Sequence, residues 1–179
     1  MENLNYILSL NPAAKIKYVK KGEFLLREGE NSTQAFFVKM GLLRSYTIDE
    51  KGKEHIFMFA TQGWIIADIE SQEFNQPAKL FIDCIEDSDV IAFNRNLFSK
   101  LELSKYQLTK NLNLLARRAA VLQRRVLMLM SSTAKERYEF FLETYPELPD
   151  RVPQRMIASY LGITPEALSK IRGKMVKSE

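Results

Sequence analysis

The stretch YLGITPEALSKI, residues 160–171, carries the signals for the end of one helix and the start of another. Gly162 can take the left-handed backbone conformation that closes a helix. Thr164 is a natural N-cap, and Pro165 fits the first position of the next helix. Glu166 then lies in the first turn, where its negative charge is favourable against the helix dipole. The stretch therefore predicts two helices joined by a turn of three residues.

Two short helices joined in this way make a helix-turn-helix, whose second helix can enter the major groove of DNA. The segment QRMIASYL (154–161) supplies the first helix, which Pro153 is well placed to start, and the second spans about residues 165–172. The sequence matches the known pattern of the motif at seven diagnostic places, which are Ile157, Ala158, Leu161, Gly162, Ile163, Leu168 and Ile171. An ordinary helical hairpin is the alternative that these matches disfavour.

Charge is distributed unevenly along the 179 residues. The first 93 residues contain 10 Lys and Arg against 14 Asp and Glu, and the remainder contains 16 against 8, so the two parts carry about −4 and +8. The basic C-terminal part favours a nucleic-acid partner, although a solvated helical surface alone also explains such an excess.

Short apolar segments separated by glycines fill the first 93 residues. Five of the seven glycines lie in the first 63 residues, and Gly52 is expected to supply a positive φ in the hairpin turn of residues 47–55. The expected strands are KIKYV (15–19), EFLLR (23–27), QAFFVKM (34–40), LLRSYTI (42–48), EHIFMFA (54–60), AKLFIDCI (78–85) and DVIAF (89–93). We expect a β-roll of the jelly-roll kind, preceded by a short helix over residues 2–10.

Helical periodicity replaces the strand pattern from residue 94, and a long helix is expected to reach residue 132. Apolar residues recur along it at heptad spacing, namely Leu101, Leu108, Leu112, Leu115, Ala119, Leu122, Val126 and Leu129. This seam predicts a parallel homodimer joined along the helix, and the alternative is a helix packed against its own roll. Four arginines lie off the seam and are expected on the solvated side of the helix: Arg117, Arg118, Arg124 and Arg125.

The predicted architecture is therefore α+β, with three parts in sequence. Residues 1–93 form a β-roll effector domain, residues 94–132 a dimerisation helix, and residues 133–179 a helix-turn-helix domain. The last part begins with a further helix in SSTAKERYEFFLETYP (131–146), which a serine or threonine caps and Pro146 ends.

This order of roll, long helix and helix-turn-helix resembles the cyclic AMP receptor family (Crp/Fnr) of bacterial transcription regulators over nearly the whole chain. FFVKMGLLRSY (36–46) is similar to that family's strand-glycine-strand signature, QGWIIAD (62–68) to its entry into the ligand pocket, and GITPEALSKIR (162–172) to its recognition helix. The resemblance implies a sequence-specific DNA-binding regulator that binds palindromic operators as a homodimer. It also implies RNA polymerase as a further partner.

The resemblance locates a candidate effector pocket, in which this sequence departs from the family. Cyclic-nucleotide binders of the family carry Gly-Glu-Leu, whose glutamate holds the ribose hydroxyl, and later Arg-Ser or Arg-Thr, whose arginine pairs with the cyclic phosphate. The candidates at these places here are Gly63, Ala67, Asp68, Ile69, Ala78 and Lys79. Asp68 can still accept from a ribose, but Ala78 offers no charge to a phosphate, so we expect that cyclic AMP is not the effector. Lys79 either supplies a point charge or turns to solvent.

Other sensing chemistries of the family lack their residues in this sequence. Iron–sulfur sensing needs several cysteines, and Cys84 is the one present. His55 is the one histidine, and we expect it to be a strand residue near a turn and not a haem ligand. We expect neither a cofactor nor a metal. The effector is left open between an apolar molecule, an altered nucleotide, a partner protein and none.

The helix-turn-helix and the tail behind it supply the candidate DNA contacts, which are Arg155, Thr164, Pro165, Glu166, Ser169, Lys170, Arg172 and Lys174. Arg155, Arg172 and Lys174 are expected to contact phosphates. Glu166, Ser169 and Lys170 are expected to read bases. Gly173 is expected to cap the recognition helix early, and because few residues come after it, we expect no β-hairpin wing.

Enzyme signatures are absent from the sequence. The GxSxG, HExxH, CxxC and P-loop patterns do not occur, and one histidine cannot complete a cupin-type metal site. No run approaches the roughly 18 to 20 apolar residues of a membrane span, and the first residues lack a signal-peptide pattern, so a cytoplasmic location is expected. The alternative function is a signalling module that binds a protein instead of DNA through its C-terminal domain.

Overall fold

The computed structural model describes residues 15–94 and 104–176 and divides the chain into two compact units, Met1–Leu101 and Glu102–Glu179. Two expected features fall outside the described residues: the short helix at the N-terminus and Leu101 of the heptad seam. The long helix was expected from residue 94, but Asn94 ends a strand, and the helix begins at Lys105 after a capping box at Ser104. Among the residues that are described, no helix is both long and apolar enough to cross a membrane.

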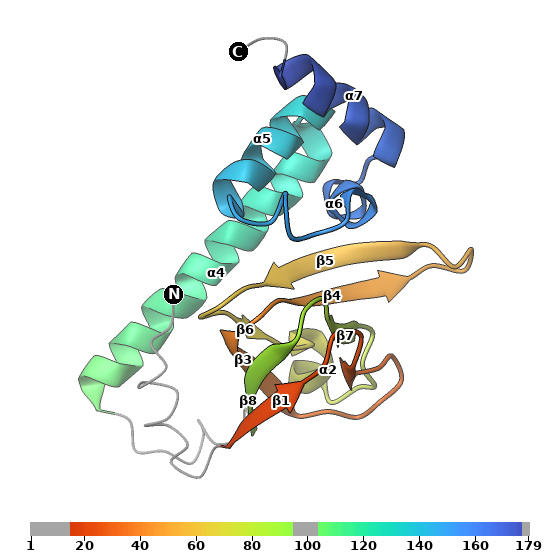
Figure 1. Cartoon of the computed structure of the whole chain (residues 1–179). Helices are drawn as coiled ribbons and strands as arrows, with labels where there is room; N and C mark the ends of the chain where they lie inside the picture. Colours follow the sequence, from red (N-terminus) through yellow and green to blue (C-terminus); the bar gives the residue numbers. More distant parts are fainter. Residues whose placement is uncertain (1–14, 95–103, 177–179) are drawn as a thin grey trace. The chain divides into compact units, whose positions relative to one another are not determined.

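The N-terminal unit is built from two four-stranded antiparallel sheets, ordered β1-β8-β3-β6 and β2-β7-β4-β5 (Figure 1). Its strands are β1 (Ile16–Val19), β2 (Phe24–Leu26), β3 (Gln34–Met40), β4 (Leu43–Ile48), β5 (Glu54–Ala60), β6 (Ile65–Ile66), β7 (Phe81–Cys84) and β8 (Ser88–Asn94). One short helix, α2 (Ile69–Phe74), lies between β6 and β7. The sheets confirm the jelly-roll prediction.

Two glycines make the turns on either side of β4. Gly52 has a φ of +78° in the β4–β5 hairpin, as predicted. Gly41 has a φ of +103° between β3 and β4, and a Cβ added there would lie 2.2 Å from Oγ of Ser88. The chain therefore requires glycine at this position both for its backbone conformation and for close approach to β8.

Apolar side chains of both sheets meet in the interior of the roll. The buried cluster is Val19, Leu26, Phe36, Val38, Leu43, Ala60, Ile66, Ala78, Ile82, Cys84 and Val90. Burial raises the pKa of the Cys84 thiol to about 11, so this cysteine is an inert core residue. Ser45 follows Leu43 on the same face of β4 and is fully buried. Among the described residues, its Oγ is the one buried side-chain oxygen or nitrogen without a hydrogen-bond partner.

The C-terminal unit is helical and comprises α4 (Lys105–Ser131), α5 (Ala134–Thr144), α6 (Gln154–Leu161) and α7 (Pro165–Val176) (Figure 1). Thr133 begins α5 with a capping box, in which its side chain accepts from the backbone N–H of Glu136 and the Glu136 carboxylate accepts from the backbone N–H of Thr133. Only Ser132 and Thr133 separate α4 from α5. The long helix thus ends where the sequence predicted.

Aromatic rings form the centre of the helical unit. Phe141 of α5 is fully buried, and its ring centroid lies 5.6 Å from the rings of both Tyr145 and Tyr160. Tyr145 and Tyr160 meet edge to face at 5.8 Å. These ring pairs pack α5 against α6 and so support the helix-turn-helix.

Two predictions about this unit are wrong. Gly173 does not end α7, which continues to Val176. A glycine inside a helix costs only about 1 kcal/mol, which is too little to end α7 by itself. Arg125 does not face solvent, because its guanidinium lies 4.0 Å from the centre of the Tyr160 ring and donates to the Tyr160 carbonyl at 3.3 Å.

Candidate nucleic-acid interface and effector site

The turn between α6 and α7 has the geometry that its sequence predicts. Gly162 adopts a left-handed conformation, with φ 65° and ψ 33°, and comes directly after the last residue of α6. The hydroxyl of Thr164 accepts a hydrogen bond from the backbone N–H of Ala167 at 3.2 Å, which makes Thr164 the N-cap of α7. Pro153 precedes α6 as its N-cap residue, so that helix begins one residue later, at Gln154.

One face of α7 is fixed inside the unit and the other is exposed. Leu168 is fully buried and Ile171 is half-buried. Seven of the eight candidate DNA contacts are exposed, namely Arg155, Thr164, Pro165, Glu166, Ser169, Lys170 and Lys174. Arg172 is half-buried. The structure therefore presents the expected base-reading side chains together along the outer side of α7.

Glu166 is held as a carboxylate at the N-terminus of α7. Its own backbone N–H lowers the pKa of its side chain most, and the Thr164 hydroxyl and the charge of Lys170 lower it further. An ionised carboxylate accepts hydrogen bonds and donates none, so it suits the amino group of cytosine in a major groove.

Asp68 is the candidate acceptor for a ribose hydroxyl, but its carboxylate is already bonded within the chain. Oδ1 accepts from the backbone N–H of Ser71 at 3.0 Å, and Oδ2 accepts from those of Lys79 and Leu80 at 2.8 and 3.0 Å. The side chain is buried and serves as the N-cap of α2. Three of the roughly four acceptor sites of this carboxylate are therefore used, and its burial leaves little access for a ribose hydroxyl.

The remaining pocket candidates provide no anchor for a phosphate. Ala78 lies in the core and exchanges backbone hydrogen bonds with Gly29 and Glu30. The ammonium group of Lys79 is exposed and pairs with the carboxylate of Glu70, so its side chain is directed toward solvent. Gly63 takes a φ of +84° in the turn before β6, Ala67 is half-buried, and Ile69 is exposed at the start of α2.

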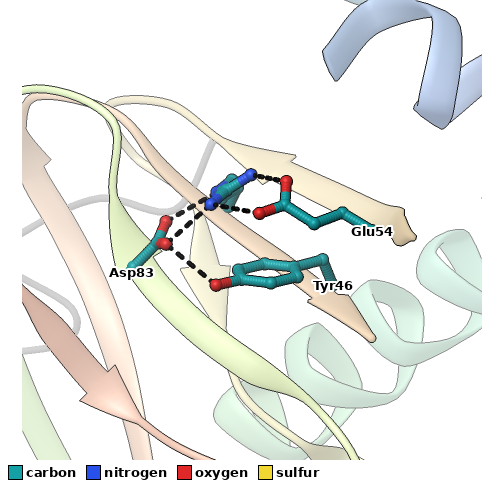
Figure 2. Close-up of polar contacts among 4 residues, drawn as sticks. Tyr46, Glu54 and Asp83 are labelled. Carbon is teal, nitrogen blue, oxygen red and sulfur yellow. Dashed lines mark hydrogen bonds and ion pairs between the residues drawn. The ribbon is translucent and has the colours of Figure 1, made fainter. Parts of the chain in front are cut away.

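A buried charged cluster that the sequence analysis missed lies on the sheet formed by β2, β7, β4 and β5. At its centre, the guanidinium of Arg44 lies between the carboxylates of Asp83 and Glu54 (Figure 2). Arg44 donates to Asp83 from Nε at 2.7 Å and from Nη2 at 2.9 Å, and to Glu54 from Nη1 at 2.5 Å. The Tyr46 hydroxyl donates to Asp83 at 3.2 Å, and the Arg44 guanidinium lies 4.0 Å from the centre of the Tyr46 ring.

These bonds satisfy Arg44 internally, so the cluster ties three strands together and leaves no cation for an anionic ligand. Burial by itself would lower the pKa of Arg44, but its hydrogen bonds to Asp83 and Glu54 raise that pKa above the ordinary value. A charged residue in the middle of each of two apolar strands, LLRSYTI and LFIDC, is the signal from which the pair was foreseeable.

The heptad seam of α4 is exposed along most of its described length. Leu108, Leu112, Leu115, Leu122 and Val126 are 43–60% exposed, and Ala119 between them is exposed as well. Leu129, which was expected in the same seam, is not exposed like the others. It is half-buried, and its Cδ2 lies 3.6 Å from the position that a Cβ on Gly162 would take, so it packs toward the helix-turn-helix.

Comparison with known proteins is consistent with this architecture. Residues 16–104 match the family model of the cyclic nucleotide-binding domain. The chain is 26% identical to Electron transport regulator A of Shewanella oneidensis over 176 residues, which cover 90% of this chain and 69% of that protein. It is also 26% identical to the Fumarate and nitrate reduction regulatory protein of Vibrio cholerae over 178 residues, covering 91% and 69%.

Solved structures show the same fold. The structure of FixK2 from Bradyrhizobium japonicum matches with a TM-score of 0.76 at 23% identity, covering 93% of this chain and 86% of that one. A Crp/Fnr-family transcriptional regulator from Thermus thermophilus matches with a TM-score of 0.67 at 20% identity, covering 92% and 87%. The named relatives are regulators rather than enzymes. With its roll, long helix and helix-turn-helix in the expected order, the chain belongs to the Crp/Fnr family of transcription regulators.

Proposed function

We propose that this regulator binds operator DNA as a homodimer and reads an inverted repeat with its two α7 helices. The observation that carries the proposal is the two-sided character of α7, in which Leu168 is buried while Glu166, Ser169 and Lys170 stand exposed on the other side. A dimer of this kind places its reading helices about 34–36 Å apart, in successive major grooves.

Affinity that does not depend on sequence would come from contacts with phosphates. Arg155 on α6 and Lys174 on α7 are exposed, and Arg172 is half-buried on α7. Such cations release counterions when they bind DNA, so binding should weaken steeply as salt is raised. Discrimination between bases would come from Glu166, with Ser169 and Lys170.

The exposed seam of α4 supports the dimer. Fully burying one Leu or Val side chain contributes about 1.5–3 kcal/mol, and the five leading seam residues of each copy are roughly half exposed in the single chain. Two copies would therefore gain on the order of 10 kcal/mol, which is of the same size as the cost of association, about 4–15 kcal/mol. The dimer should accordingly depend on each of these five seam positions.

The effector of this regulator would be something other than cyclic AMP. The absence of a cation at Ala78, the engagement of Asp68 by three backbone amides and the outward direction of Lys79 support this. An apolar molecule, an altered nucleotide, a partner protein and no effector remain the alternatives. Operator-bound dimers would act in the cytoplasm, with RNA polymerase as the expected partner.

Selection of bound sequences from a random duplex pool, carried out at two salt concentrations, tests the proposal. We expect enrichment of one inverted repeat, with fewer sequences retained at the higher salt. Retention of DNA without enrichment, or no retention at either salt, would count against a sequence-specific regulator and would favour the protein-binding module instead.

A further inference from the structure

The junction between α4 and α5 decides the direction in which the helix-turn-helix leaves the long helix. Only Ser132 and Thr133 lie between the two helices, and both have extended backbone conformations. Two residues with free φ and ψ would allow α5 many directions relative to α4. Contacts across this junction are therefore needed to select one.

Arg137, in the first turn of α5, makes two such contacts and a third with the end of α6. Its Nε donates to the carbonyl of Ser132 at 3.1 Å, Nη2 donates to that of Leu129 at 2.8 Å, and Nη1 donates to that of Leu161 at 3.1 Å. Leu129 belongs to the last turn of α4, Ser132 caps that helix, and Leu161 is the last residue of α6. One guanidinium thus connects the C-terminal ends of two helices.

The chemistry of arginine fits this position closely. The last carbonyls of a helix lack partners within the helix, and the C-terminus carries partial negative charge. Arginine has five N–H donors in a rigid planar arrangement, so it can serve three carbonyls at once and complement both helix ends. The ammonium group of lysine has donors that radiate from one nitrogen and cannot reach three separated carbonyls in this way.

Arg125 supplies a second connection between the same helices. It projects from α4 onto the ring of Tyr160 in α6, at 4.0 Å from its centre, and donates to the Tyr160 carbonyl at 3.3 Å. The two carbonyls that end α6, those of Tyr160 and Leu161, are therefore each held by an arginine of a neighbouring helix.

The short turn between α6 and α7 links the position of α7 to that of α6. Gly162 comes directly after Leu161, its left-handed conformation starts the turn, and α7 begins at Pro165. A Cβ on Gly162 would lie 3.5 Å from Nη1 of Arg137, so this guanidinium sits immediately beside the turn. Displacement of Arg137 would free both the α4–α5 junction and the start of the turn that aims α7.

We infer that Arg137 is a positioning residue that fixes α7 relative to the dimerisation helix and thereby sets the half-site spacing that the dimer accepts. The inference rests on the proposed function. One inserted base pair moves a half-site by about 3.4 Å and rotates it by about 35° around the DNA axis. If the two α7 helices are held at one angle, the dimer binds a changed spacing more weakly. If they are loosely held, they can adjust to the changed spacing.

The test compares Arg137→Gln and Arg137→Lys with Lys135→Gln. Lys135 is an exposed residue of the same helix, and its ion pair with Glu139 at 3.4 Å lies on the surface, so it is a matched control for loss of charge. Each protein is titrated with duplexes that carry two copies of the selected half-site at the selected spacing or at one base pair fewer, one more or two more. A duplex with a single half-site completes the set.

We expect the wild type and Lys135→Gln to prefer one spacing by about tenfold or more. Arg137→Gln should reduce that preference to about threefold or less, with its affinity for the single half-site within about twofold of wild type. Arg137→Lys should fall between them. An unchanged spacing preference in Arg137→Gln would overturn the inference, and so would an equal loss on every duplex including the single half-site, which would indicate a merely structural role.

A second measurement needs no DNA. Gln154 is exposed at the first position of α6, and Gln154→Cys can carry a spin label, because burial of Cys84 raises the pKa of its thiol to about 11 and protects it at neutral pH. The distance between the two labels of a dimer should be narrowly distributed in the wild type and in Lys135→Gln and broad in Arg137→Gln.

The two measurements separate the inference from the function on which it rests. If the wild type binds no specific DNA and Arg137→Gln still broadens the distance distribution, the proposed function fails and the positioning role stands. An unchanged distribution overturns the positioning role whatever the DNA result. A labelled protein that gives no inter-label distance because it is monomeric overturns both.

Discussion

The carboxylate of Asp68 accepts a hydrogen bond from the backbone N–H of Lys79 at 2.8 Å, and both residues are candidates for the effector pocket. The same oxygen accepts from Leu80, and the other oxygen accepts from Ser71. Asp68 is thus an internal support of α2. The fold of an effector domain does not by itself fix the chemistry of its effector.

Cyclic AMP should leave the stability of the protein nearly unchanged. With a dissociation constant of 1 mM or weaker, 1 mM ligand stabilises the folded state by about 0.4 kcal/mol or less, which corresponds to at most about 2 °C in Tm. Thermal unfolding with and without 1 mM cyclic AMP checks this, with 5′-AMP at the same concentration as the control. An increase of more than about 5 °C, specific to the cyclic nucleotide, would show that the pocket binds it without the missing cation.

Tyr46 should make the protein lose stability in alkaline solution. Burial, followed by the negative charge of Asp83, raises the pKa of Tyr46 to about 12, whereas the unfolded chain has a pKa of about 10. Between these values the unfolded state releases the phenolic proton and the folded state keeps it, so the stabilisation present below pH 10 is lost as pH rises toward 12. The loss due to Tyr46 should reach about 1 kcal/mol by pH 11.

Urea unfolding at pH 9, 10 and 11 measures this effect in the wild type and in Tyr46→Phe. The variant lacks the titrating hydroxyl, so its stability should fall less steeply over this range. Tyr18, whose pKa is also raised by its hydrogen bond to Asp87, contributes equally to both proteins and cancels in the comparison. Parallel slopes for the two proteins would refute the assignment to Tyr46.

Replacement of Gly41 by alanine should destabilise the roll far more than replacement of Gly52. Both glycines have positive φ, which costs an alanine about 1–2 kcal/mol. A Cβ at position 52 meets nothing within 4 Å, but a Cβ at position 41 meets Oγ of Ser88 at 2.2 Å and its Cα at 2.7 Å. We expect Gly41→Ala to lose about 3 kcal/mol or more and Gly52→Ala about 1–2 kcal/mol in urea unfolding. Equal losses would mean that the backbone of β8 yields easily at Ser88.

A charge in the heptad seam should dissociate the dimer. Leu115 lies in the middle of the seam and is 60% exposed in the single chain. Leu115→Glu would place two carboxylates opposite one another in an apolar interface, so the variant should sediment as a monomer at concentrations where the wild type is a dimer. Tyr106→Glu is the control, because Tyr106 is exposed on α4 but lies off the seam. A dimer that survives Leu115→Glu would exclude this seam as the interface.

Local signals made the helix-turn-helix predictable. Gly162, Thr164 and Pro165 act through backbone geometry within their own few residues, and each does in the structure what its type predicts. Gly173 failed by the same logic. The cost of a glycine inside a helix is only about 1 kcal/mol, which is too little to end α7 by itself.

Most contacts between distant segments could not be predicted from the sequence. Arg137 bonds to Leu161 across 24 positions, and nothing near Arg137 in the sequence marks its partner. For Arg44 and Asp83, 39 positions apart, the one signal was a charged residue within each of two apolar strands. Arg124 and Arg125 are adjacent in the sequence of one helix, and nothing there distinguishes them. In the structure, the guanidinium of Arg125 lies 4.0 Å from the centre of the Tyr160 ring, and that of Arg124 lies 5.6 Å from the centre of the Phe140 ring. Which side of a helix becomes buried depends on the elements that pack against it, and these are known only once the chain has folded.

The reading of bases by α7 is tested most directly by repeating the selection of bound duplexes with Glu166→Ala, beside the wild type and Lys174→Ala. Glu166 is exposed at the N-terminus of α7, and its own backbone N–H, followed by the Thr164 hydroxyl, lowers its pKa and so favours the carboxylate further. We predict that Glu166→Ala recovers the wild-type inverted repeat with one position in each half-site no longer specified, a loss of about 1–3 kcal/mol of discrimination there. Lys174→Ala should recover the full repeat with uniformly weaker binding and a salt slope smaller by about one. An unchanged repeat from Glu166→Ala would show that Glu166 reads no base and would contradict the role proposed for this end of α7.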